Sequence, residues 1–149
     1  MAQLFGIELV PASVPLGAPF LEAAAVLTAH PVSTIAVLDR DGRVVGLFGG
    51  DHLLTGLFPA YLKELRHTAF ITDDELLFER RAREAAHEPV EKHMAEPLVV
   101  DTGTSATHVA ELFLHFEEDA LPVVEDGRFL GMLGRSEFCR AMLRRAERR

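Results

Sequence analysis

Seven histidines are the first side chains in this 149-residue sequence to suggest chemistry, because imidazole is a common metal ligand and proton carrier. Zinc sites typically pair histidines four residues apart on a helix, or combine histidine with cysteine at short spacing. The nearest pairs here are His87 with His93, six residues apart across Pro89, and His108 with His115, seven apart. Neither pair has ligand spacing, so the sequence predicts no metal site.

Nucleophilic and acid–base chemistry have equally little support. Cys139 is the single cysteine and has no histidine beside it, so we interpret it as a residue on the apolar face of the last helix. The run Asp73-Asp74-Glu75 is typical of the first turn of a helix, where the helix dipole favours carboxylates. The sequence contains no Gly-x-Ser-x-Gly element, phosphate-binding Walker loop or paired catalytic carboxylates. We therefore predict no catalytic residues and a protein that is not an enzyme.

Composition limits the remaining possibilities. With 48% hydrophobic and 26% charged residues, the chain can bury a core, and its net charge of -8 argues against nucleic-acid binding. Arg140, Arg144 and Arg148 recur at four-residue spacing, but cations are ordinary at a helix C-terminus. The stretch from Met1 to Phe20 lacks the basic start of a secretory signal, and no apolar run approaches membrane-spanning length. A single cysteine suits a reducing compartment, so we expect a cytoplasmic protein.

An internal repeat organises the chain. Sliding the sequence against itself by 86 positions, with one residue dropped in a turn, gives nine identities in one register. The identical pairs are Pro11/Pro97, Val14/Val100, Gly17/Gly103, Ala24/Ala110, Val37/Val123, Gly42/Gly127, Arg43/Arg128, Gly46/Gly131 and Gly49/Gly134. Matching glycines, together with a repeated Gly-Arg turn, indicate two copies of one structural unit.

Each copy predicts the same elements in the same order. A short extended segment (12–14; 98–100) precedes an amphipathic helix (19–29; 106–116), then two strands that form a hairpin. The strands are 35–38 and 44–48 in the first copy, and 121–124 and 129–133 in the second. An Asp-Gly pair turns each hairpin, because glycine tolerates positive φ. A second helix (51–58; 136 to about 145) closes each copy.

A helical insertion separates the copies. We predict a helix from Asp73 to His87, started by a capping box of Thr72 and Glu75 and ended by Pro89. The predicted organisation is therefore a first repeat at 1–58, an insertion at 59–93 and a second repeat at 94–149. The fold class is α/β (α+β), with two pseudo-twofold-related repeats, each a small sheet with two helices.

This pattern resembles the paired cystathionine-beta-synthase (CBS) domain, or Bateman module. The second copy carries Lys92-His93-Met94, the hairpin 121–128 and the strand 129–133, and the first copy carries 35–46, which match the family's motifs. The resemblance implies a regulatory or sensor module that binds an adenosine ligand, such as AMP or ATP, in clefts between the repeats. No cofactor is required.

The family binds such ligands partly through a Thr or Ser three residues after the strand glycine and an Asp three residues further on. This sequence has Gly49 and Gly134 at the hydroxyl positions, and His52 and Glu137 at the carboxylate positions. Both copies therefore depart from the nucleotide-binding pattern at both positions. The alternative to a sensor is a ligand-free structural or dimerisation module with degenerate clefts.

The resemblance places the candidate ligand residues in two clefts. The second-copy cleft would contain Pro97, Leu98, Ala120, Leu121, Gly134, Arg135, Ser136 and Glu137. The weaker first-copy cleft would contain Ala12, Thr34, Ile35, Gly49, Gly50, Asp51 and His52.

Charge favours the second cleft for a phosphate. Arg135 lies beside a helix start, whereas its first-copy counterpart is Gly50, followed by Asp51. The alternative interpretation is that Arg135 is only a solvated cation on the surface. Glu137 either reaches a ribose or is only a first-turn glutamate, and Asp51 and Ser136 match positions of helix N-caps.

The family habit of pairing modules through helices predicts a homodimer. Leu76, Leu77 and Phe78 of the insertion are candidates to extend that interface. The regulated protein partner is not predicted by the sequence.

Overall fold

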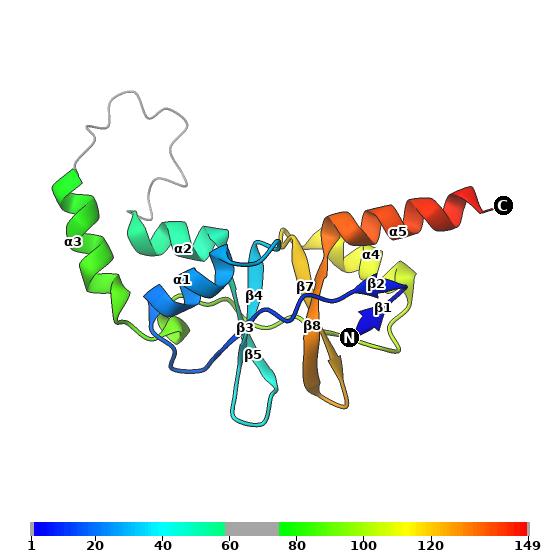
Figure 1. Cartoon of the computed structure of the whole chain (residues 1–149), viewed down its shortest axis with the longest axis horizontal. Coiled ribbons are helices and arrows are strands. Elements are labelled where there is room, and N and C mark those ends of the chain that lie inside the picture. Colours follow the sequence, from blue (N-terminus) through cyan, green and yellow to red (C-terminus); the bar gives the residue numbers. More distant parts are fainter. Residues whose placement is uncertain (1, 59–74, 149) are drawn as a thin grey trace.

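The computed structural model of the chain describes residues 2–58 and 75–148 and contains two small three-stranded sheets (Figure 1). The first sheet has the order β3-β4-β5 and the second the order β6-β7-β8. In each sheet the first pair of strands is parallel and the second pair antiparallel. The two sheets thus share one topology, as the internal repeat predicted.

The first repeat consists of β3 (Ser13–Pro15), α1 (Phe20–Thr28), β4 (Thr34–Leu38), β5 (Val44–Gly49) and α2 (Gly50–Leu57). The second consists of β6 (Val100–Asp101), α4 (Ala106–His115), β7 (Ala120–Glu125), β8 (Arg128–Gly134) and α5 (Arg135–Glu147). Each predicted helix and hairpin strand is present within two residues of its predicted ends. The predicted element order and fold class are therefore confirmed.

The turn of the first hairpin is one residue longer than the turn of the second, as the alignment of the two repeats required. Asp126 and Gly127 both have positive φ (52° and 81°), which is the backbone of a tight two-residue turn. In the first repeat the loop is longer, and the Asp39 carboxylate closes it by accepting from the backbone N–H groups of Asp41 (2.9 Å) and Arg43 (3.0 Å).

The segments that lead into the repeats cross over to the opposite repeat. Val10 pairs with Met132 on β8, whereas Ala95, just before the second repeat, pairs with Leu47 on β5. Two backbone hydrogen bonds of 2.9 and 2.7 Å fix the first pair, and two of 2.8 and 3.0 Å fix the second. Each repeat therefore completes the sheet edge of the other.

The core has two parts. One cluster surrounds the first sheet but includes Ala120 and Met132 of the second repeat. The other surrounds the second sheet and includes Leu4, Ile7 and Leu9 from the start of the chain. Leu4 and Ile7 belong to an N-terminal hairpin of β1 (Gln3–Leu4) and β2 (Ile7–Glu8), and Leu9 follows it directly; the sequence analysis did not predict this hairpin.

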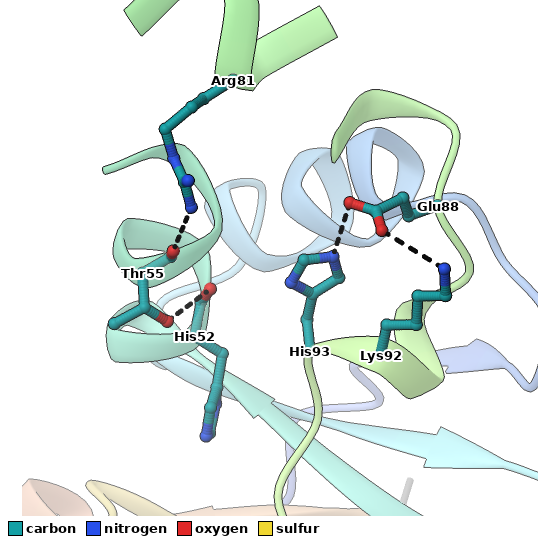
Figure 2. Close-up of polar contacts among 6 residues, drawn as sticks. All are labelled: His52, Thr55, Arg81, Glu88, Lys92 and His93. Atoms are coloured by element: carbon teal, nitrogen blue, oxygen red, sulfur yellow. Dashed lines mark hydrogen bonds and ion pairs between the residues drawn. The ribbon is translucent and has the colours of Figure 1, made fainter. Parts of the chain in front are cut away.

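The insertion returns to the first repeat through α3 (Glu75–Ala86) and the short 3-10 helix η2 (Val90–Lys92). The Arg81 guanidinium donates to the Thr55 carbonyl of α2 (Nη2 to O, 3.3 Å), as Figure 2 shows. Glu88 lies between Lys92 and His93, with an N–O distance of 3.5 Å to each. The predicted helix is confirmed over 75–86, while Thr72, Asp73 and Asp74 lie outside the described residues.

Candidate functional site: two clefts between the repeats

A cleft of about 530 Å³ opens beside the start of α5. Four of its predicted residues, Gly134 to Glu137, line it. The other lining residues are Gly6, Ile7, Glu8, Leu9, Val10, Pro11, Pro31, Val32, Asp119 and Arg144. The wall facing α5 is thus the N-terminal hairpin and the segment after it, which sequence reasoning missed.

The remaining residues predicted for this cleft lie elsewhere. Ala120 and Leu121 are fully buried in the core, and Pro97 and Leu98 are not among the lining residues. The reason is the crossing of the lead-in segments. Because Ala95 pairs with the first sheet, the segment that leads into the second repeat lies away from this cleft. Leu9 to Pro11 line the cleft in its place.

The second-copy cleft carries both charges. Arg135 and Arg144 bring cations from α5, while Glu8, Asp119 and Glu137 bring carboxylates. Glu137 also forms an ion pair with Arg140 one turn along the helix. The Glu137 side chain therefore lines the cleft and is also paired with Arg140. Ser136, which carries a hydroxyl, lines the cleft beside Gly134.

A second cleft of about 480 Å³ lies beside the start of α2. It is lined by the predicted residues Thr34 and Gly49 to His52, joined by Ser33, Thr55, Glu117, Glu118 and Asp119. Ala12 and Ile35, also predicted for this cleft, are instead fully buried in the core. Four carboxylates line the first-copy cleft, and no arginine or lysine is among its lining residues.

The carboxylates of the second repeat are tied to the first. The Thr34 hydroxyl lies 3.0 Å from Glu118 Oε2 and 2.9 Å from Asp119 Oδ1, and the Ser33 N–H donates to Asp119 Oδ2 (3.1 Å). Thr34 is only 2% exposed, so its two bonds are partly shielded from water, whereas the bond from Ser33 is exposed. Because Asp119 lines both clefts, it forms a shared wall between them.

The helix starts beside both clefts lie one residue earlier than predicted. Gly49 and Gly134 are the N-cap residues, so the prediction that Asp51 and Ser136 are N-caps is wrong. In the first repeat, His52 at the third helical position reaches back to the N-cap, where its Nδ1 accepts from the Gly49 N–H (2.8 Å). Glycine at the N-cap costs a helix little, which is why the earlier start is tolerated.

The described part of the chain offers no grouping of side chains for metal or thiol chemistry. Within residues 2–58 and 75–148, no three His, Cys, Asp or Glu side chains are grouped so that they could hold a metal ion. Cys139 is exposed, so its placement on a buried apolar face is wrong; Phe138 and Ala141 are the buried residues of α5. Each helix in the described part of the chain is too short or too polar to cross a bilayer.

Comparison with known families decides the identity of this arrangement. The CBS domain matches the chain twice, over residues 9–58 and 90–144. The chain belongs to the CBS domain family. Its two matches correspond to the two sheets with their helices, so the molecule is a CBS pair, an architecture that is generally regulatory and not catalytic.

Solved CBS structures share the fold. CBSX2 from Arabidopsis thaliana is 23% identical, with a TM-score of 0.70 over 95% of this chain and 94% of that chain. A CBS domain-containing protein of unknown function from Kribbella flavida DSM 17836 is 21% identical, with a TM-score of 0.69 over 91% and 94%. CBSX2 has also been solved in complex with AMP, at 24% identity and a TM-score of 0.64 over 93% and 94%. No curated protein matches the sequence.

Proposed function

We propose that this CBS pair is a regulatory module that binds an adenosine nucleotide in the second-copy cleft. The observation that carries the proposal is the different charge of two clefts built from equivalent positions. Arg135 occupies the position of Gly50, whereas Pro31 and Val32 occupy the positions of Glu117 and Glu118. The second-copy cleft therefore has an apolar wall and two arginines among its three carboxylates, whereas the first-copy cleft has four carboxylates and no arginine or lysine among its lining residues.

The second-copy cleft has the chemistry of an amphipathic anion site. Val10, Pro11, Pro31 and Val32 form an apolar wall on which a base can lie. Arg135 and the first turn of α5, whose N-cap glycine makes no side-chain hydrogen bond to it, favour a phosphate. Ser136 and Glu137 offer polar groups to a ribose. The structure of CBSX2 with AMP supports this choice of ligand class.

The first-copy cleft is a poor phosphate site. Asp51 and the three carboxylates of 117–119 would repel an anion, and no lining cation offsets them. We therefore do not propose that Thr34, Gly49, Gly50 and His52, which line this cleft, bind a nucleotide.

Calorimetric titration of AMP and ATP into the wild type and Arg135→Ala tests the proposal. We expect micromolar or weaker affinity, because the family hydroxyl is missing at Gly134 and one hydrogen bond contributes about 0.5–1.5 kcal/mol. Removing the cation should weaken binding roughly tenfold, which corresponds to about 1.4 kcal/mol. Arg148→Ala, at an exposed position just after the far end of α5, is the matched control and should bind normally.

A ligand-free dimerisation module is the second candidate function. It is favoured by the glycines at both hydroxyl positions, Gly49 and Gly134, and by exposed leucines on the helices. No heat with either nucleotide at millimolar concentration, and no thermal shift, would leave this candidate in place of the first. A ligand at 100 times its Kd should otherwise stabilise the fold by about 2.7 kcal/mol.

A further inference from the structure

The N-terminal hairpin has an unusual turn. Phe5 and Gly6, which join β1 to β2, both have positive φ (55° and 75°). Glycine adopts this conformation freely, but a bulky residue rarely does, and such strain is retained only where the surroundings enforce it. The Phe5 ring packs edge-on against Phe138 of α5, with ring centroids 5.8 Å apart. The turn is thus held by an aromatic contact with the helix beside the second-copy cleft.

The hairpin belongs to the second repeat, although it precedes the first in the chain. Leu4 and Ile7 are 7% and 6% exposed and pack in the same core cluster as Phe113, Phe138 and Ala141. Figure 1 shows the hairpin beside the second sheet and α5, far from α1 and α2. A change in the position of the hairpin would therefore alter its packing against the second repeat.

The same hairpin is one wall of the cleft. Gly6, Ile7 and Glu8 face it from one side, while Arg135 to Glu137 and Arg144 line it from α5. A ligand that fills the cleft contacts both walls and holds them together. Phe138 also packs against Phe113 of α4 at 5.6 Å, so three rings connect the hairpin turn with both helices of the second repeat.

We propose that the N-terminal hairpin is a regulatory wall of the ligand site, whose attachment to α5 is coupled to ligand binding. Because coupling is reciprocal, a bound ligand tightens the hairpin on α5, and loosening the hairpin weakens the ligand. A partner that draws residues 3–8 away from Phe138 releases the ligand. This inference rests on nucleotide binding in the second-copy cleft.

Phe5→Gly in the full chain tests the contact between the hairpin and α5 without changing the backbone conformation that the turn requires. Glycine keeps the turn, since it accepts positive φ, but removes the ring that contacts Phe138. We expect the calorimetric Kd for AMP or ATP, whichever binds the wild type more tightly, to rise about threefold to tenfold. Gln3→Ala is the control, because Gln3 is exposed on the same hairpin and does not line the cleft.

Amide exchange of residues 2–10 in the wild type gives a second readout that needs no variant. Saturating nucleotide should slow exchange in this segment. An unchanged Kd in Phe5→Gly, or unchanged exchange of 2–10 in a wild type that binds with measurable heat, overturns the role of the hairpin. No heat in the wild type overturns the proposed nucleotide site itself, so the two failures are distinct.

Discussion

At the scale of single residues, Gly46 and Gly131 occupy equivalent positions in the two repeats. Each lies against the segment that leads into the other repeat. A Cβ on Gly131 would lie 2.7 Å from Leu9 Cβ and 3.2 Å from the Val10 carbonyl oxygen. A Cβ on Gly46 would lie 2.2 Å from Met94 Sδ. Each glycine therefore leaves room for the segment that crosses from the other repeat.

The two positions should tolerate alanine differently. Gly131→Ala meets backbone in the paired Val10–Met132 segment, so we expect it to lower the free energy of unfolding by about 1–3 kcal/mol. Gly46→Ala meets a flexible side chain, and the double variant Gly46→Ala/Met94→Ala should relieve that overlap. Urea denaturation of the three proteins measures the difference. Equal losses at both sites, with no relief in the double variant, would argue against the crossing arrangement.

These glycines also show what could be predicted from the sequence. Their identity across the repeats, with the Asp-Gly turn and the periodic helices, predicted the two units because those signals are local. The crossing itself was not predicted, since pairing of Val10 with Met132 leaves no periodic trace in either segment. Gly134 to Glu137 line the cleft for which they were predicted, because their position follows from their own strand, whereas Leu9 to Pro11 lie where Pro97 and Leu98 were predicted. That these residues bind a ligand stays a prediction.

At the scale of elements, α3 packs on α1 and α2 of the first repeat. The Phe78 ring packs on Phe58 at a centroid distance of 5.2 Å, Arg81 donates to Thr55, and Ala85 is buried in the core. Both rings are more than a third exposed, so their contact is only partly shielded. Phe78, predicted as part of a dimer interface, thus packs against its own chain.

Removing the Phe78 ring should loosen α3 without unfolding the module. We expect Phe78→Ala to speed amide exchange in residues 75–86 several-fold, while the global free energy of unfolding falls by less than about 1 kcal/mol. Glu84→Ala, at an exposed position on the same helix, should leave exchange unchanged. Exchange that rises equally throughout the chain would instead mean that α3 unfolds only with the whole molecule.

At the scale of the whole molecule, the pseudo-twofold fold carries unequal charge. The repeat gives two clefts of similar size, about 530 and 480 Å³. The residues that differ between the copies give one cleft two arginines and an apolar wall, whereas the other is lined by four carboxylates and no arginine or lysine. Asp119 joins them through its bonds to Ser33 and Thr34. A duplicated scaffold can therefore hold one ligand site while its second cleft serves the contact between repeats.

The helices of both repeats leave leucines uncovered, and these carry the last prediction. Leu114 on α4 and Leu143 on α5 are 78% and 61% exposed, and Leu21 on α1 and Leu54 on α2 are 61% and 55% exposed. A stable pair of proteins buries about 800 Å² on each partner, which helix faces with such residues can supply. We expect a homodimer, with a mass near twice 16.4 kDa, about 33 kDa, in sedimentation at micromolar concentration.

We expect the second-repeat helices to form the dimer interface, because α3 packs on α1 and α2 and covers part of the first-repeat face. Leu114→Glu/Leu143→Glu should therefore shift the sedimenting species toward the 16.4 kDa monomer, since each carboxylate would otherwise be buried without a partner. Leu16→Glu, at an exposed leucine outside the helices, is the matched control and should remain dimeric. A wild type that sediments only as a monomer would contradict the homodimer. A double variant that stays dimeric would exclude α4 and α5 as its interface and direct attention to Leu21 and Leu54.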